Sequence, residues 1–436
     1  MKSLIVCISC CIFVSLFTGC ETEDSFLNNI EETTAESELT RWREEQNLWM
    51  YEMMKHHYYW TAEIPDSNLL SFGIEPSKFF LTLKSSQDRF SWYEANVNYN
   101  GIYTKLVEGL EFETYQVCGS MVSRILYVSS PYLIERGLKR GDFVKIIVCK
   151  LGHLLEKGII KNGEFVITDR IFVSPILLRN RNIAPTVSLD SIYIINNKRI
   201  GYFVYNQFES STDVAQIAIR LKNLGIDELI LDLRYNPGGY VSTSNYLASM
   251  LAPTEQLGSL YQLQRFNDKV TKEKQKNGGS GIDSVFLNKG SITVQRNLDL
   301  SRLVVLTTKN TASASESLII GLRPYMKVVT IGTTTCGKDV GSYTIADNNY
   351  KYQLQPITFK YYNANNESTP TTGIVPDIYV EDDLDHQRGD TNEALLKAAI
   401  EYLTGEIQIG AVKDRSVSQP KMKEVGRSSI EIKNNL

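Results

Sequence analysis

Apolar positions between residues 191 and 412 occur in short continuous runs that alternate with segments of helical spacing. The continuous runs predict buried strands. The segments in which apolar residues recur every three or four positions predict helices. The strands are expected at 193–195, 200–204, 228–233, 303–307 and 328–331, and the helices at 213–224 and 315–325. This alternation predicts an α/β core (mixed α+β) over residues 190–412, with a largely parallel or mixed central sheet.

Two other patterns precede this core. Apolar and aromatic residues from Leu39 to His57 recur at mostly helical spacing and predict an amphipathic helix, and a second helix is expected at 76–85. These helices define a helical N-terminal region, 39–100. A β-rich module follows at 101–180, with short runs at 115–118, 122–128, 143–148 and 165–167. A polar tail, 413–436, ends the chain.

Residues 129–142 of the β-rich module read Ser-Ser-Pro-Tyr-Leu-Ile-Glu-Arg-Gly-Leu-Lys-Arg-Gly-Asp. Pro131 suits the first turn of a short helix, Gly137 suits its end, and Gly141-Asp142 suits a turn into the next strand. This order of strand, short helix, turn and strand resembles a PDZ domain. PDZ domains add an extended peptide to a sheet edge, so the resemblance implies a module that holds peptide C-termini.

The chain begins like a leader peptide. Lys2 is followed by an apolar run, 4–17, which is shorter than the roughly 20 residues that span a bilayer, so a cleaved signal peptide, 1–19, is expected. The segment Phe17-Thr18-Gly19-Cys20 resembles the lipobox of bacterial lipoproteins, which implies lipidation of Cys20. A polar, acidic tether, 20–38, would follow. The expected location is the cell envelope, with the exported chain anchored by lipid to a bacterial membrane; an ordinary secretory leader is the alternative.

Composition narrows the classes of partner. The formal net charge of -4 argues against nucleic acid, and 42% hydrophobic with 22% charged residues is typical of globular domains. Cys118, Cys149 and Cys336 are scattered, without a C-x-x-C pair or histidines at ligand spacing, so neither a disulfide framework nor a metal site is predicted. His56 and His57 are adjacent and cannot share one helix face, which favours a structural role.

The first motif with chemical potential spans residues 231–239, Leu-Asp-Leu-Arg-Tyr-Asn-Pro-Gly-Gly, at the end of a predicted strand. A Pro-Gly-Gly corner turns sharply and leaves backbone N–H groups unshielded, so these groups could stabilise a developing oxyanion. The alternative is a simple tight turn.

The second motif is Asn310-Thr311-Ala312-Ser313-Ala314-Ser315-Glu316, between a predicted strand and a predicted helix. Small residues at this corner allow a substrate to approach closely, and Ser313 would lie at the positive end of the helix. Ser313 and Glu316 also have the spacing of a capping box, which is the structural alternative.

The third motif is Thr335-Cys336-Gly337-Lys338, after the predicted strand 328–331. It does not continue as a phosphate-binding loop, because Asp339 follows the lysine where such loops carry serine or threonine. Nucleotide binding is therefore excluded.

In this order the three motifs resemble the carboxyl-terminal processing protease family, also called tail-specific proteases, which join a PDZ domain to a serine peptidase core. The resemblance covers about 101–404, including a 25-residue spacing from Ser313 to Lys338 and the later segments Tyr361-Tyr362 and 373–377. It implies a serine endopeptidase that needs no cofactor and cleaves polypeptides near their C-termini.

The resemblance also implies a role for each motif. Ser313 would be the nucleophile and Lys338 the general base, with an oxyanion hole from Gly238 or Gly239 and Ala314. Lysine accepts a proton only when neutral, so burial must lower its pKa from about 10.4.

One position departs from the family pattern. A glutamine that usually orients the lysine is replaced by Ser342, and a hydroxyl would have to take over this role. Asp339 is expected to point away from Lys338, because an ion pair would favour the charged lysine. The alternative function is a catalytically silent, surface-anchored lipoprotein that binds peptides through the PDZ-like module. The long insert 254–293 is either a substrate lid or an assembly arm.

Overall fold

The computed structural model describes residues 23–95, 109–117, 119–149, 152–174, 187–209, 211–290, 292, 296–347, 352–410 and 423–427. The expected leader and its Cys20 lie outside these residues. The chain divides into two compact units, one of Met1–Glu52 with Pro65–Leu83 and the other of Met53–Ile64 with Lys84–Leu436. None of the described helices has the length and apolar character needed to cross a membrane.

The first unit is helical, as predicted. It contains most of α1 (Glu23–His57), the short helix η2 (Ser67–Leu69) and α2 (Pro76–Leu83). The Asn47 side chain donates hydrogen bonds to the carbonyls of Phe72 and Ile74 at 2.7 and 2.8 Å, which fixes the loop before α2 on α1.

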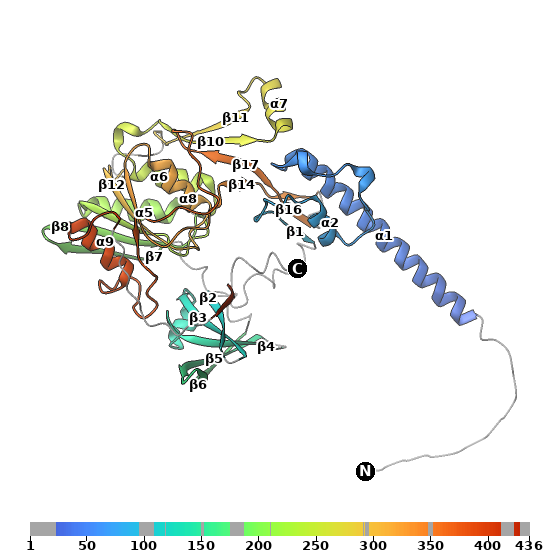
Figure 1. Ribbon diagram of the computed structural model, residues 1–436, viewed down its shortest axis with the longest axis horizontal. Helices are drawn as coiled ribbons and strands as arrows, with labels where there is room; N and C mark the ends of the chain where they lie inside the picture. The colour runs from blue at the N-terminus through green and yellow to red at the C-terminus, as the bar shows by residue number, and fades with distance from the viewer. Residues whose placement is uncertain are drawn as a thin grey trace, which may run out of the picture. The chain divides into compact units, whose positions relative to one another are not determined.

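Helix α1 begins at Glu23, well before the predicted start at Leu39, and covers most of the range predicted as a flexible tether (Figure 1). The physical reason is local: residues 23–38 contain no glycine or proline, and acidic residues in a first turn favour a helix N-terminus.

The second unit is built on a six-stranded sheet in the order β18-β13-β12-β9-β8-β7. The strands from β8 to β18 are parallel, and β7 pairs with β8 in antiparallel fashion. The predicted α/β core with a mixed sheet is therefore confirmed. The strand bounds are Val187–Ile195 (β7), Lys198–Tyr205 (β8), Glu228–Asp232 (β9), Arg302–Thr307 (β12), Lys327–Gly332 (β13) and Ile378–Tyr379 (β18).

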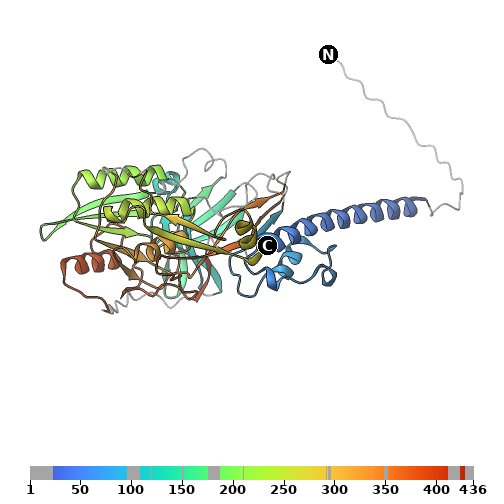
Figure 2. The ribbon, with the colours of Figure 1, turned by 90° about the horizontal axis from the view of Figure 1, so that it is seen from above.

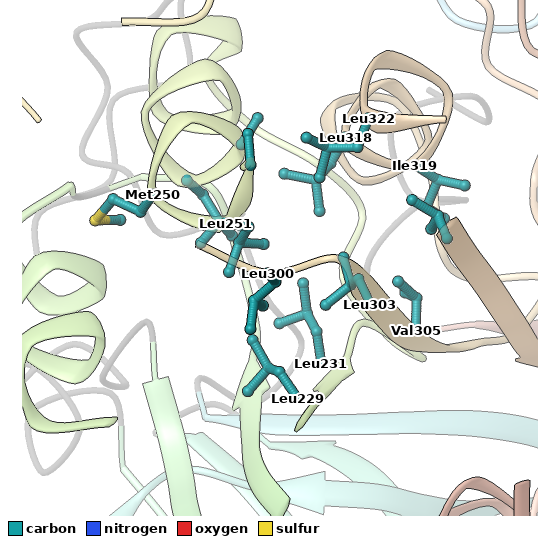
Figure 3. Packing of buried hydrophobic residues seen from close by; sticks show 14 of the residues in the cluster. Leu229, Leu231, Met250, Leu251, Leu300, Leu303, Val305, Leu318, Ile319 and Leu322 are labelled. Atoms are coloured by element: carbon teal, nitrogen blue, oxygen red, sulfur yellow. The ribbon is translucent and has the colours of Figure 1, made fainter. Parts of the chain in front are cut away.

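Helices cover both faces of this sheet (Figures 1 and 2). The first face packs on α5 (Ser211–Asn223), α6 (Val241–Leu251) and α8 (Ala314–Leu322), and the other on α9 (Ala394–Thr404). Side chains that alternate along a strand point to opposite faces: Leu229 and Leu231 join the first cluster, and Ile230 joins the second. Figure 3 shows leucines of β9 and β12 packed against α6 and α8.

The insert 254–293 extends a second, antiparallel sheet in the order β11-β10-β17-β14. It contains η3 (Thr254–Gln256), β10 (Leu260–Phe266), α7 (Asp268–Lys276) and β11 (Ile282–Phe286), and β10 pairs with β17 (Ile357–Tyr362). The strand after the third motif, β14 (Val340–Ser342), also pairs with β17. A small three-stranded sheet joins β1 (Trp92–Ala95), β16 (Tyr352–Gln355) and β15 (Ile345–Ala346).

The β-rich module is an antiparallel sheet in the order β19-β2-β3-β4-β5-β6 around its own apolar cluster. Its short helix α3 (Pro131–Glu135) opens at the predicted proline, and Gly137 and Gly141 both adopt a positive φ. The sequence pattern missed β5, and the edge strand β19 comes from the predicted polar tail. The strands are Leu110–Val117 (β2), Ser120–Val128 (β3), Phe143–Cys149 (β4), Gly152–Lys161 (β5), Glu164–Val173 (β6) and Lys423–Arg427 (β19).

Candidate active site

The three sequence motifs lie at the carboxyl ends of β9, β12 and β13, which are neighbours in the parallel sheet. Ligand sites of open α/β sheets form at this edge. Residues separated by about a hundred positions in the chain are brought together by this topology alone.

Ser313 is the residue immediately before α8, the N-cap position that the structural alternative gave it. Its backbone has φ 57° and ψ −115°, whereas an ordinary N-cap is extended. A non-glycine residue in this region is strained by about 1–3 kcal/mol and persists only where its surroundings enforce it. Strain of this kind is typical of functional corners, which supports Ser313 as the candidate nucleophile.

The Pro-Gly-Gly corner lies directly against this serine. A Cβ placed on Gly238, whose φ is 103°, would be 2.8 Å from the Ser313 Cβ and 2.9 Å from the Ala314 nitrogen. Only glycine allows this approach. Asn236 secures the corner, because its carbonyl accepts hydrogen bonds from Ala312 N and Ser315 Oγ, both at 3.1 Å.

The candidate oxyanion donors differ in availability. The Gly238 N–H donates to Asn236 Oδ1 at 2.9 Å, so this donor is already engaged. Within the described residues, no acceptor is recorded for the N–H of Gly239 or of Ala314. Ala314 is the first residue of α8, where backbone N–H groups have no partner inside the helix. Gly239 and Ala314 are therefore the better-placed candidates.

Glu316 joins the nucleophile corner to the lysine loop. Its Oε2 accepts the backbone N–H of Ser313 at 2.9 Å and that of Lys338 at 2.8 Å. Its Oε1 accepts the N–H of Gly337 at 2.7 Å and the hydroxyl of Thr335. Burial is the largest influence and raises the pKa of Glu316, although these hydrogen bonds stabilise its charged form and limit the shift. A single buried carboxylate thus holds the backbones of both candidate catalytic residues.

Tyr361 connects the same two residues, Ser313 and Lys338, through their backbone carbonyls. Its hydroxyl lies 2.8 Å from the Lys338 carbonyl and 3.5 Å from that of Ser313, and 3.0 Å from the Thr369 hydroxyl. From the sequence, Tyr361 was predicted only to be part of a family-like strand. The role of Glu316 had a local signal in its capping-box spacing, whereas that of Tyr361 had none.

Lys338 is partly buried, and this burial lowers the pKa of its ammonium group below the usual value. Cys336, Asp88 and Glu316 oppose the shift, because negative charge near the lysine raises its pKa. No ion pair is recorded for Lys338 in the described part of the chain. Burial therefore shifts the lysine toward the neutral form that a general base requires.

Asp339 is paired with a lysine other than Lys338, which agrees with the expectation that it does not form an ion pair with the candidate base. Its carboxylate forms an ion pair with Lys360 Nζ at 2.6 Å. Ser342 is also engaged elsewhere, because its Oγ accepts a hydrogen bond from Gln355 Nε2 at 2.7 Å. The residue at the usual glutamine position is therefore bonded to a glutamine of β16.

A cavity of about 600 Å³ opens beside Lys338. Its lining comes from the lysine loop, from β17 and from the segments 59–60 and 86–90, and includes Tyr59, Trp60, Arg89, Phe90, Lys360 and Tyr362. The lining combines aromatic, polar and charged side chains, and the space is large enough for a peptide side chain.

Among the described residues, no group of histidine, cysteine, aspartate and glutamate side chains is arranged to hold a metal ion. Two of the described histidines pair with carboxylates instead: His56 with Glu273 at 3.2 Å, and His386 with Asp383 at 2.7 Å.

Comparison with known proteins agrees with the geometry. The model named Peptidase family S41 matches residues 199–380, and the Peptidase S41 N-terminal domain matches 45–92. The Carboxyl-terminal-processing protease of Synechocystis sp. (strain ATCC 27184 / PCC 6803 / Kazusa) is 28% identical over 229 residues, 51% of this chain and 47% of that protein. The same-named protein of Picosynechococcus sp. (strain ATCC 27264 / PCC 7002 / PR-6) is 25% identical over 241 residues, 53% of this chain and 52% of that protein.

The chain spans about half the length of these curated relatives. The crystal structure of a candidate S41 protease from Bacteroides fragilis NCTC 9343 superposes with a TM-score of 0.68 and 26% identity, covering 83% of this chain and 98% of that one. With its strained serine, its lysine loop and both matching domains, this chain belongs to peptidase family S41, which includes the carboxyl-terminal processing proteases.

Proposed function

We propose that this protein is a serine endopeptidase in which Ser313 attacks the scissile carbonyl and Lys338 accepts the serine proton. The observation that carries the proposal is the shared attachment of both residues to Glu316 and Tyr361. Because these two groups hold both backbones, the nucleophile and the base are prepositioned, which is how a Ser-Lys pair gains reactivity.

The reaction follows from the groups in place. Neutral Lys338 takes the hydroxyl proton of Ser313 as its oxygen bonds to the substrate carbonyl carbon, and the carbonyl oxygen becomes negative. The N–H groups of Gly239 and Ala314 would donate to that oxyanion. Protonated Lys338 then gives its proton to the leaving amine, and water hydrolyses the acyl-enzyme by the same route in reverse.

Fluorogenic-peptide and casein hydrolysis by the wild type, Ser313→Ala and Lys338→Ala tests this assignment. Loss of either group should reduce kcat by at least about 10³-fold. Lys276→Ala and Ser280→Ala, two exposed positions on and after α7, are matched controls that should keep wild-type rates. Equal activity in all five proteins would refute the assignment.

Cleavage near polypeptide C-termini is proposed because the relatives are carboxyl-terminal-processing proteases by name and because the chain has a PDZ-like module. The module's strands, its short helix and its glycine turns support a peptide-holding role. Peptides with free and amidated C-termini should differ in kcat/KM if the terminal carboxylate is recognised. Peptide binding without hydrolysis would instead favour the catalytically silent alternative.

Export and anchoring through Cys20 are proposed from the leader and the lipobox-like segment alone. Mass spectrometry of the protein expressed with its leader should show an N-terminal lipidated cysteine. Cys20→Ala should release the protein from the membrane fraction, and an unmodified N-terminus would contradict the proposal.

A further inference from the structure

The segment that follows the first unit, residues 84–95, forms a rigid turn beside the lysine loop. Asp88 is buried, and its Oδ1 accepts the backbone N–H groups of Phe90 and Ser91 at 2.8 and 2.9 Å. Its Oδ2 accepts the hydroxyl of Tyr58 at 2.8 Å, and that hydroxyl accepts the N–H of Ser85 at 3.0 Å. Every oxygen of this carboxylate is therefore used to fix the turn.

The turn is attached to β17 through Ser91, and the segment 56–59 beside it is attached to β17 and to the start of α7. The N–H of Ile357 donates to Ser91 Oγ at 2.8 Å, and the N–H of Tyr59 donates to the Ile357 carbonyl at 2.7 Å. The Asn267 side chain donates to the carbonyls of His56 and Tyr58, both at 2.9 Å. The turn is thus part of the same rigid surroundings as Tyr361.

Two side chains of this turn reach the loop that carries Lys338. Arg89 Nη2 donates to the carbonyls of Cys336 and Gly337 at 3.0 and 3.1 Å, and lies 3.5 Å from that of Thr371. The Lys338 Nζ lies over the Phe90 ring, 5.1 Å from its centroid. One residue therefore holds the loop backbone, and the next covers the end of the lysine side chain.

We propose that Arg89 and Phe90 are positioning residues for Lys338, supplied by the N-terminal region, which fix the lysine loop and shield its amine from water. The proposal rests on the Ser-Lys function proposed above. It also accounts for Ser342: because that hydroxyl is hydrogen-bonded to Gln355, the lysine takes its orientation from Arg89 and Phe90 instead.

The groups facing Lys338 decide the effect of removing the ring. Asp88 and Cys336 raise the pKa of the lysine, as does Glu316 of α8, whereas burial lowers it and is the largest influence. Asp339 is paired with Lys360, and Arg89 is bonded to backbone carbonyls. The Phe90 ring attracts the ammonium through its π face, by about 0.5–1 kcal/mol, but it also excludes water. Since burial has the larger influence, loss of the ring should raise the pKa.

The test compares Phe90→Ala, Phe90→Leu, Arg89→Met and Arg89→Lys with the wild type, in peptide hydrolysis from pH 6 to 10.5. Phe90→Ala should move the rising limb of kcat/KM to higher pH by at least half a unit, and Phe90→Leu should restore it. Arg89→Met should lower kcat at least tenfold with little change in KM. Phe286→Ala, which removes an exposed ring of β11, is the matched control and should change neither quantity.

A second measurement does not depend on turnover. NMR of protein labelled with ¹⁵N at the lysine side-chain nitrogen gives the pKa of Lys338, with Lys338→Met identifying its signal. Phe90→Ala should raise this pKa relative to the wild type and Phe90→Leu. If the wild type does not hydrolyse peptides, the Ser-Lys function fails while this measurement still decides the shielding role. Unchanged pKa values and unchanged kcat in folded Phe90→Ala and Arg89→Met would overturn the proposal.

Discussion

At the scale of single residues, the site depends on ionisable groups whose burial is energetically unfavourable. Glu316 is fully buried, yet its two oxygens together accept four hydrogen bonds, from Ser313 and from the lysine loop. A carboxylate with this many donors can remain charged away from water. Glu316 therefore caps α8 and, through the same oxygens, also holds the lysine loop in place.

Glu316→Gln should impair both activity and stability. The amide keeps one acceptor oxygen but turns an NH₂ group toward N–H donors, which leaves buried groups unsatisfied at about 1–3 kcal/mol. We expect at least a tenfold fall in kcat and a lower urea midpoint. Glu255→Gln, an exposed glutamate of η3, is the matched control and should leave both unchanged. Wild-type kinetics in Glu316→Gln would show that the carboxylate does not position the site.

Lys338→Met should abolish hydrolysis and stabilise the fold. Burial lowers the pKa of Lys338 in the folded protein, so the folded state binds this proton less well than the unfolded chain does. Wild-type stability should therefore rise with pH between the folded pKa and about 10.4. The advantage of Lys338→Met, about 1 kcal/mol at pH 7, should shrink over that window.

Urea unfolding at pH 7 and pH 10 measures this difference. Lys360→Met is the comparison variant. It removes the partner of the buried Asp339 and should destabilise the protein at both pH values. If Lys338→Met is less stable than the wild type at pH 7, burial of the Lys338 amine does not destabilise the folded protein.

At the scale of elements, the parallel core and the order of the three motifs were predictable. Continuous apolar runs identify buried strands, and the carboxyl ends of neighbouring parallel strands meet at one edge. The pattern could not show the turn at Arg89 and Phe90, since it contacts loops almost 250 positions away. Strand β5 was missed because it includes polar and charged residues, such as Glu156 and Lys157, among its apolar ones. Roles for Ser313 and Lys338 followed from motif resemblance, and their connection through Glu316 required the structure.

The pairing of β19 with β2 is another feature that the sequence did not reveal. Lys423–Arg427 pairs in antiparallel fashion with β2, so backbone groups at this edge of the β-rich module are used within the chain. Deletion of 423–436 should increase amide hydrogen exchange in β2 several-fold, whereas deletion of 428–436 should not. Equal exchange in both truncated proteins would show that the pairing does not protect the edge.

At the scale of the whole molecule, a buried charge network joins the β-rich module to the core. Arg140 of the module donates to Asp382 Oδ1 at 2.7 Å and to the Tyr235 hydroxyl. Arg234 donates to the same Asp382 oxygen at 3.0 Å and to Glu393 at 2.8 Å. Since Arg234 and Tyr235 belong to the first motif, the module is bonded directly to the segment that carries the Pro-Gly-Gly corner.

Arg140→Met should therefore weaken both the fold and the site. Burial alone would raise the pKa of Asp382, but Arg140 and Arg234 lower it to about 2. Its contribution to stability is present above about pH 3.9 and is lost as the pH falls toward 2. Removing Arg140 leaves this carboxylate with less compensation, and breaking a buried pair typically costs about 3–5 kcal/mol.

Urea unfolding at pH 7 should show this loss for Arg140→Met, and the deficit should narrow below pH 4 as Asp382 becomes protonated. Arg170→Met, which removes an exposed partner of Glu156, is the matched control and should change stability by no more than about 0.5 kcal/mol. Because Tyr235 loses a partner next to the corner that holds Gly238, kcat should fall as well in the folded variant. Wild-type kcat with reduced stability would mean that the network joins module and core without influencing the corner.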